Sequence, residues 1–399
     1  MASDKDPITR VSEPVRFKPR KRSFFRGIIR MFGFVVLIGL IVAGALAWTG
    51  FTLSASGPLA AKKIVQVPKA ADRVAIAALL QQEGVITSTR LFSIAALVDE
   101  QLRHAHLKTG EYDFPAHASM TTVLSMLSRG EVVKYKVTIP EGWTSQMVVN
   151  RLNEQEELDG QVSATPAEGT LLPETYIVTR GYTRDRLLAD MAAAQNKILE
   201  TVPAQITPGS PLKSKEEVIT LASIVEKETG VAEERPEVAA VFLNRLKQHM
   251  RLQSDPTVIY GIVGGLGKLD RPITRDDLDG ETPYNTYVID GLPPGPIANP
   301  GKAAIEAVLN PANVPYLYFV ANGTGGHAFA TTLEEHNANV KKWRSLNGSV
   351  EPAVTAKPVT ASPPAAPLSN TVAPADATPP TPPAPVVKPK VKLKKPKLP

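Results

Sequence analysis

The sequence contains no cysteine and few aromatic residues for its length. None of its 399 residues is cysteine, which excludes disulfides, thiolate nucleophiles and thiolate metal sites. Aromatic residues make up 6% of the chain, and no motif interleaves basic with aromatic positions, so nucleic-acid binding is not indicated. The basic residues behind the net charge of +6 gather at the two ends. The excess charge therefore belongs to terminal segments and not to a basic groove.

Motifs for metal ions, phosphates and serine nucleophiles are also missing. No histidine pair has the spacing of a zinc-dependent protease, the P-loop spacing is absent, and no nucleophile elbow occurs. His104 and His106 lie two apart, and residues at that spacing on a helix face different directions, so we interpret both as surface residues. We expect no metal ion and no cofactor.

An uncharged apolar run near the N-terminus follows a basic segment. Residues 31–48 read MFGFVVLIGLIVAGALAW, and the next charged residue is Lys62. About 20 apolar residues cross the roughly 30 Å of hydrocarbon in a bilayer. We predict a cytoplasmic basic tail at 1–30 and a transmembrane helix at 31–51, which leaves the bulk of the chain outside. Ala45 and Ala47 form an A-x-A pattern, so a cleaved secretory signal is the alternative.

The rest of the chain divides by composition and pattern. Hydrophobic residues make up 43% of the sequence, enough for a sizeable core. After a linker at 52–63, short strands and helices predict a small α/β module at 64–132, followed by a larger domain at 133–345. We therefore expect an α+β fold class. Residues 346–399 are dominated by Pro, Ala, Thr and Val, and we predict that they are disordered.

The candidate chemistry lies in the stretch from Ser214 to Thr257. Ser214 and Glu217 fit a capping box at a helix start, and Gly230 fits a left-handed stop after the helix. Helical spacing groups the apolar residues of this helix into one stripe that faces a core. The stripe consists of Val218, Leu221, Ala222 and Val225.

Two glutamates flank this stripe. Glu226 projects on one side of it and Glu228 on the other. A half-desolvated carboxyl keeps its proton to higher pH, and it can then donate that proton to a leaving oxygen. The helical wheel does not choose between the two residues, and acidic residues beside an apolar stripe are often ordinary surface residues.

Polar and rigid segments surround this helix in the sequence. Glu141, in the turn Pro140-Glu141-Gly142, is interpreted as a residue that caps or braces the turn. The segment RLQSDPT at 251–257 is predicted to be a loop that could bind sugar hydroxyls or amides, although a structural turn at Asp255-Pro256 fits equally. The segment GLPPGPI at 291–297 has little backbone freedom, which suits the wall of a cleft.

Several long motifs in a fixed order resemble the endolytic murein transglycosylase family (MltG/YceG-like) of bacterial inner membranes. They are SIVEKET around Glu226, VFLNRL, RLQSDPTVIYG, YNTY, GLPPGPIANPG and the turn G-H-x-F. The resemblance runs from residue 64 to Trp343 and includes the preceding membrane span. It implies a LysM-like module at 64–132, a periplasmic catalytic domain at 133–345, and an acid at the first Glu of VEKE, which is Glu226.

The family cleaves the β-1,4 bond between N-acetylmuramic acid and N-acetylglucosamine within glycan strands and leaves 1,6-anhydro ends. The resemblance implies that Glu226 protonates the glycosidic oxygen and then helps the C6 hydroxyl of the same sugar to attack C1. Expected partners are peptidoglycan strands, the inner membrane and peptidoglycan synthases, with a role in limiting strand length. The candidate glycan-binding residues are Gln253, Asp255, Thr257, Tyr260, Tyr284, Asn285 and Tyr287.

Two other functions fit the same residues. The chain could be a non-catalytic scaffold that binds peptidoglycan through the module and the cleft. It could also be a muramidase that uses water, with His327 or Asp255 as the base.

Overall fold

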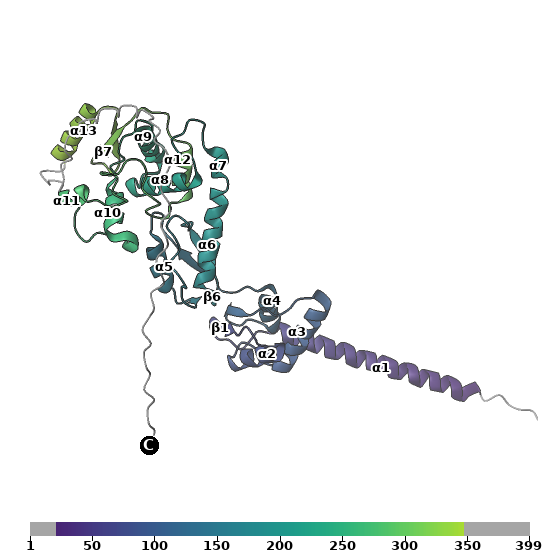
Figure 1. The fold of residues 1–399 in the computed structure, drawn as a ribbon. Coiled ribbons are helices and arrows are strands. Elements are labelled where there is room, and N and C mark those ends of the chain that lie inside the picture. The colour runs from purple at the N-terminus through teal and green to yellow at the C-terminus, as the bar shows by residue number, and fades with distance from the viewer. Residues whose placement is uncertain (1–20, 347–399) are drawn as a thin grey trace, which may run out of the picture. The chain divides into compact units, whose positions relative to one another are not determined.

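The computed structural model describes residues 21–346. Within these residues the fold is mixed α+β, as predicted, and the strands form four two-stranded sheets (Figure 1). Most of the predicted basic tail and nearly all of the predicted disordered segment lie outside the described residues.

The N-terminal helix α1 (Lys21–Ser54) contains the predicted transmembrane segment. Its portion Gly27–Ser54 is long and apolar enough to cross a membrane, and its large apolar side chains are exposed. The hydroxyls of Thr49 and Thr52 donate to carbonyls four residues earlier, so these polar groups are satisfied inside the helix. By length and composition, α1 is therefore compatible with a single-pass anchor.

A small module follows, built on one antiparallel strand pair. It comprises β1 (Lys63–Val67), α2 (Arg73–Gln82), α3 (Thr89–Arg103), β2 (Gly110–Phe114) and α4 (Met120–Arg129). Lys63 lies opposite Phe114 in the β1–β2 pair. The side chains of Asp72, Ser88 and Ser119 each accept a backbone N–H at the start of a helix. The predicted elements of the module are confirmed, and its likeness to a LysM fold stays a prediction.

His104 and His106 lie on the surface of the module, as interpreted. His104 and His106 are both exposed, and His104 ends α3 with a left-handed backbone. The Nδ1 atom of His106 lies 3.1 Å from a carboxylate oxygen of Glu100.

The next part joins two further strand pairs to two helices. Its elements are β3 (Tyr135–Thr138), α5 (Ser145–Asn153), β4 (Leu158–Asp159), β5 (Thr175–Val178), β6 (Tyr182–Thr183), α6 (Arg184–Leu199) and the short α7 (Val202–Gln205). β3 pairs with β5 in antiparallel fashion and β4 with β6 in parallel. The guanidinium of Arg184 donates to the carbonyls of Leu152 and Leu158, which ties the end of α5 to β4.

The largest core lies around α8. The elements of this part are α8 (Lys215–Glu228), α9 (Arg235–Lys247), α10 (Asp255–Val263), α11 (Arg275–Asp279), α12 (Lys302–Leu309), the hairpin β7 (Tyr318–Ala321) and β8 (His327–Ala330), and α13 (Leu333–Leu346). α8 packs against both α9 and α12. The predicted apolar stripe is buried, but burial extends all round α8 from Val218 to Val225. Because helices surround α8, it is a central helix and not an amphipathic surface helix.

Two hydroxyl groups inside this core are hydrogen-bonded. The hydroxyl of Thr220 donates to the carbonyl of Glu216, and that of Ser223 donates to the carbonyl of Thr220. The Ser223 hydroxyl also accepts the N–H of Ile297 at 3.0 Å. This bond fixes the proline-rich segment against α8.

Three local predictions around α8 need correction. Ser214 caps the helix, but the carboxylate of Glu217 accepts from the N–H of Lys213 and not from Ser214, so the capping box is only half formed. α8 ends in an extended Thr229, and Gly230 is not left-handed. The segment from Asp255 is a helix, α10, and not a loop, because Pro256 suits a first helical turn.

The strand β7 is short and only partly buried. The apolar run Tyr316–Val320 predicts a buried strand, whereas β7 spans Tyr318–Ala321 and is only partly buried. Among the described residues it pairs only with β8, and the hairpin packs against α13.

Candidate active site

Glu226 lies in the last turn of α8 with both carboxylate oxygens engaged. Its side chain is only 4% exposed. Oε2 accepts the backbone N–H of Gly301 at 2.9 Å, and Oε1 lies 3.2 Å from Nη2 of Arg235. The carboxyl is therefore held between the start of α12 and the start of α9, two elements that are distant from each other in sequence.

A second carboxylate shares the same arginine. Oε2 of Glu141 lies 3.3 Å from the Nη2 atom of Arg235 that also contacts Glu226. A Cβ on Gly301 would lie 1.8 Å from Oε1 of Glu141, so the missing side chain of Gly301 makes room for this carboxylate. Glu141, interpreted from the sequence as a brace of its turn, thus belongs to the immediate surroundings of Glu226.

The turn that carries Glu141 is fixed by the buried Asn299. Gly142 adopts a left-handed backbone, φ = 72°, and its N–H donates to the carbonyl of Asn299 at 3.0 Å. The side-chain amide of Asn299 accepts the N–H of Leu171 and donates to the carbonyl of Trp143 and to the hydroxyl of Ser145. One buried residue therefore holds two other chain segments, 142–145 and the one at Leu171, next to the site.

The surroundings of Glu226 raise its pKa. Burial is the largest cause, and the negative charge of Glu141 acts in the same direction. The N–H of Gly301 and the charge of Arg235 act in the opposite direction, because both stabilise the carboxylate. A carboxyl with a raised pKa is suited to act as a general acid near neutral pH.

With Glu226 as the general acid that the resemblance implies, these contacts predict opposite pH shifts for two variants. In Glu141→Gln the repulsive charge is lost, so the pKa of Glu226 falls. The alkaline limb of the pH profile then moves to lower pH. In Arg235→Met the stabilising charge is lost, so that pKa rises and the alkaline limb moves to higher pH. The measurement is kcat/KM for glycan cleavage against pH.

A neighbouring surface charge provides the control. Lys302, the residue after Gly301, is exposed and pairs with Glu306. Lys302→Gln removes this surface ammonium and is expected to leave the alkaline limb of the pH profile in place. Shifts of the same sign in Glu141→Gln and Arg235→Met would contradict the assignment of Glu226 as the acid.

Glu228, the other candidate from the helical wheel, lies in a different environment. Burial raises its pKa to about 7, and the hydroxyl of Ser254 donates to its Oε1 at 2.5 Å. The charge of Asp255 raises this pKa further, whereas the charge of Arg245 lowers it. α8 thus presents two carboxyls with raised pKa values, one beside Glu141 and Arg235 and one beside the start of α10.

The predicted binding residues at 253–257 divide into partly exposed and buried ones. Asp255 is exposed, and its Oδ1 accepts the hydroxyl of Tyr287 at 2.6 Å. Gln253 has a left-handed backbone, φ = 55°, and its side-chain carbonyl accepts from Arg245. Thr257 is fully buried and bonds to the Thr286 hydroxyl at 2.8 Å, so its observed role is to hold α10 in place.

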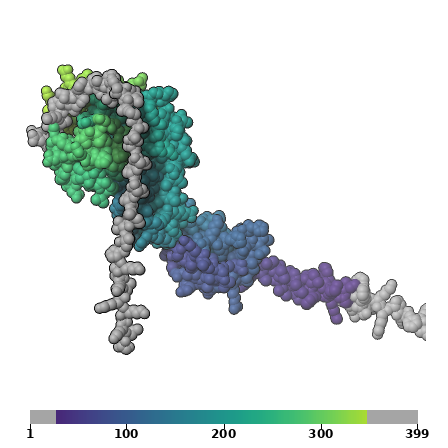
Figure 2. Space-filling model, viewed as in Figure 1, coloured from purple at the N-terminus to yellow at the C-terminus, as the bar shows by residue number. Residues whose placement is uncertain are grey.

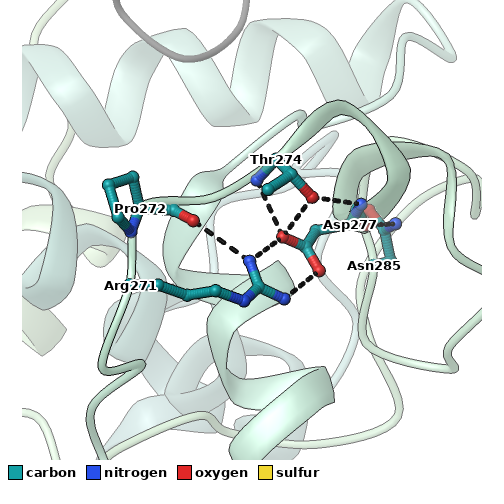
Figure 3. A network of polar contacts seen from close by, with 5 residues as sticks. All are labelled: Arg271, Pro272, Thr274, Asp277 and Asn285. Carbon is teal, nitrogen blue, oxygen red and sulfur yellow. Dashed lines mark hydrogen bonds and ion pairs between the residues drawn. The ribbon is translucent and has the colours of Figure 1, made fainter.

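Asn285 is likewise engaged inside the protein. Its side-chain amide donates to the carbonyl of Asp277 (Figure 3). It also donates to the carbonyls of Leu278 and Gly280 at the end of α11. Asp277 in turn pairs with Arg271 and completes a capping box with Thr274. Contact between Asn285 and a sugar would require these bonds to break, whereas Asp255, Tyr260, Tyr284 and Tyr287 keep accessible surface.

The rings of Tyr260 and Tyr284 meet edge to face with centroids 4.8 Å apart. Burial raises the pKa of Tyr260 to about 12, so its hydroxyl remains a donor at neutral pH. Glu168, which the sequence did not single out, acts electrostatically on Tyr260, and its carboxylate accepts the N–H of Ser145 at 2.9 Å. Burial raises the pKa of Glu168 as well.

His327 is tied to an acidic neighbour of Arg235. Its Nδ1 lies 2.7 Å from Oε2 of Glu234, and its backbone N–H donates to Oε1 of the same residue. The pair fixes the β7–β8 hairpin next to the start of α9. In the part of the chain that the structure describes, no cluster of three histidine or acidic residues has the arrangement of a metal site.

Known proteins are similar to most of this chain. The model of the YceG-like family matches residues 65–342. An endolytic murein transglycosylase of Bacillus subtilis (strain 168) is 29% identical over 313 residues, which cover 70% of this chain and 84% of that protein. A protein of the same name from Streptococcus pneumoniae (serotype 2, strain D39) is 30% identical over 359 residues, covering 77% of this chain.

The chain spans 64% of the length of that pneumococcal relative, slightly less than two thirds. Among solved structures, a yceG-like protein of Listeria monocytogenes is 30% identical, with a TM-score of 0.45. The match covers 69% of this chain and 98% of the Listeria chain.

Proposed function

Because this chain belongs to the YceG-like family, we propose that it is an endolytic peptidoglycan transglycosylase, anchored in the inner membrane by α1 with its catalytic domain in the periplasm. The observation that carries the proposal is the buried carboxyl of Glu226, whose pKa is raised and whose oxygens are fixed by Gly301 and Arg235. The names of the relatives support the reaction class.

The proposed reaction needs one carboxyl group. Protonated Glu226 donates its proton to the glycosidic oxygen between N-acetylmuramic acid and N-acetylglucosamine, and the bond from C1 to that oxygen breaks. The C6 hydroxyl of the muramic acid attacks C1, and the Glu226 carboxylate accepts the hydroxyl proton. The products are a 1,6-anhydro end and a free C4 hydroxyl, and the proton returns to Glu226, so no water is consumed.

The attacking hydroxyl belongs to the sugar that is cleaved, so it needs no separate binding site. Such an intramolecular nucleophile has a high effective molarity, which lowers the entropic part of the barrier. Burial of Glu226 supports this role because it keeps the proton on the acid until the glycosidic oxygen is in place.

Glycan binding is proposed for the residues on the α10 side. Asp255 and Gln253 offer oxygen acceptors, and the rings of Tyr260, Tyr284 and Tyr287 offer faces or hydroxyls to sugar rings. The rigid segment at 291–297, bonded to α8 through Ser223, would form one wall of the cleft. Nascent strands emerge at the outer face of the inner membrane. An enzyme anchored there would cut them near the synthases and limit their length.

Product analysis tests the proposal directly. The purified full chain is incubated with uncrosslinked glycan in water enriched in oxygen-18, and the fragments are analysed by mass spectrometry. We expect internal cuts and 1,6-anhydro ends without solvent oxygen. An absence of cleavage would favour the peptidoglycan-binding scaffold.

A water-using muramidase is the second candidate, and one observation favours testing it. Glu141 places a second carboxylate beside the arginine that contacts Glu226, and glycosidases that use water employ a pair of carboxyl groups. Reducing ends that carry oxygen-18 would support this reaction. Glu141→Gln would then abolish cleavage instead of shifting its pH dependence.

A further inference from the structure

The outward face of α3 carries an apolar stripe without a partner among the described residues. The exposed fractions are 58% for Ile94, 40% for Leu97, 49% for Val98 and 77% for Leu102. Their spacing of three, four and eight residues from Ile94 places them on one side of the helix. The opposite side is buried in the core of the module, which therefore does not need the stripe for folding.

The acidic residues of α3 are engaged elsewhere. Asp99 accepts from the hydroxyl of Ser128 on α4, and Glu100 pairs with Arg73 on α2. The stripe itself contains no acidic residue, and the exposed Arg90 lies four residues before Ile94 on the same side of the helix. Arg103, on the opposite side, pairs with Asp99. An apolar helix face beside a cation fits a lipid surface, where headgroups carry negative charge.

The module is held directly at the end of α1. Leu53 of α1 packs against the module core, and the N–H of Gly57 donates to the carbonyl of His117 at 3.1 Å. Leu59 is already buried in the module. The five residue steps from Ser54 to Leu59 span at most about 18 Å, so the module cannot lie far from the end of the helix.

The same helix end contacts α3. α1 touches both α3 and α4, and its surface runs directly into that of the module (Figure 2). About 20 residues from Met31 cross the hydrocarbon, which brings the bilayer surface to the region of Gly50. The contact between α1 and the module therefore lies at the level of the lipid headgroups.

We propose that Ile94, Leu97, Val98 and Leu102 of α3 lie in the outer surface of the lipid bilayer, so that the module is seated on the membrane and not only tethered to it. The inference rests on the proposed anchoring by α1. The continuity of α3 with the end of the membrane helix identifies lipid as the occupant. Burial of the stripe removes exposed apolar surface from water.

Site-specific probes of depth test this seating. The chain has no cysteine, so single-cysteine variants of the full chain take one fluorescent label each. The label is placed by Val98→Cys, by Leu102→Cys, by Val42→Cys within α1, and by Ile177→Cys on β5, where Ile177 is 64% exposed. The protein is reconstituted into phosphatidylethanolamine–phosphatidylglycerol vesicles that carry nitroxide lipids at shallow or deep positions.

The expected result is quenching at Val98 and Leu102 by the shallow nitroxide, at a depth of about 5–10 Å into the headgroup and acyl boundary. The label at Val42 is expected to be quenched by the deep nitroxide, and that at Ile177 by neither. Adding Leu97→Glu to the Val98→Cys variant is expected to reduce the shallow quenching, because a charged side chain opposes insertion.

The outcomes separate seating from anchoring. Quenching at Val42 without quenching at Val98 and Leu102 overturns the seating and leaves the anchor in place. An unquenched Val42 overturns the anchor itself. If the Val98 label is shielded from water only at high protein density and without lipid quenching, a second copy of the chain covers the stripe, and the lipid assignment is wrong.

Discussion

Glu226→Gln is expected to abolish strand cleavage while the protein stays folded. The amide keeps the shape of the side chain, but it has no proton to give to the glycosidic oxygen. Loss of a general acid lowers kcat by about 10²–10⁴-fold. The measurement is the release of 1,6-anhydro fragments from uncrosslinked glycan by the full chain, with far-ultraviolet circular dichroism to confirm the fold.

The matched control is Glu228→Gln, on the same helix and also with a carboxyl of raised pKa. The amide oxygen introduced by this change can still accept from the hydroxyl of Ser254. We therefore expect cleavage to remain within about tenfold of the unmodified chain, a limit that corresponds to the loss of one neutral hydrogen bond. If Glu228→Gln abolishes cleavage and Glu226→Gln does not, the acid is Glu228 and the assignment made here is wrong.

Asn299→Ala is expected to lower the free energy of unfolding by about 2–3 kcal/mol. The substitution leaves the buried N–H of Leu171 without its acceptor and removes two further bonds, to Trp143 and Ser145. An unsatisfied buried donor costs about 1–3 kcal/mol, and the lost side chain leaves a cavity as well. Urea denaturation followed by tryptophan fluorescence measures the change.

The control for this loss is Asn337→Ala, at an exposed position on α13. A surface substitution of this kind changes stability by about 0.5 kcal/mol or less. Equal losses of unfolding free energy in the two variants would show that the hydrogen bonds of Asn299 do not stabilise the fold. Asn299→Ala is also expected to lower the cleavage rate under native conditions. Asn299 holds the segment of Gly142, and both Gly142 and Gly301 lie next to Glu226.

Local sequence signals predicted most of the helices, because their causes are local. Ser214 caps α8 as predicted, and Ser119 and Thr144 cap α4 and α5 in the same way, since a cap needs only a side-chain oxygen next to the first amides. The misassigned stop at Gly230 arose because Thr229 leaves the helix in an extended conformation. The missed α10 begins with Asp255-Pro256, a pair that also fits a turn.

The surroundings of the acid could not be predicted in the same way. Glu226 meets Gly301 across 75 positions of sequence, and Arg235 meets Glu141 across 94. No periodicity encodes such pairs, since they depend on how α8, α9 and α12 pack. The YNTY and RLQSDPT motifs were read as binding residues, yet Asn285 and Thr257 bond within the protein, because short polar motifs also build buried hydrogen-bond networks.

The bare backbone of Gly301 also limits how this site can be altered. Its amide orients Glu226, and the space that a Cβ at this position would need is filled by the carboxylate of Glu141. Any larger residue there would displace that carboxylate and disturb Glu226 at the same time, so the two effects cannot be separated at this position. Substitutions at 141 and 235 change the charges around Glu226 and leave this backbone contact unaltered, so they are the routes by which the working pH could be tuned.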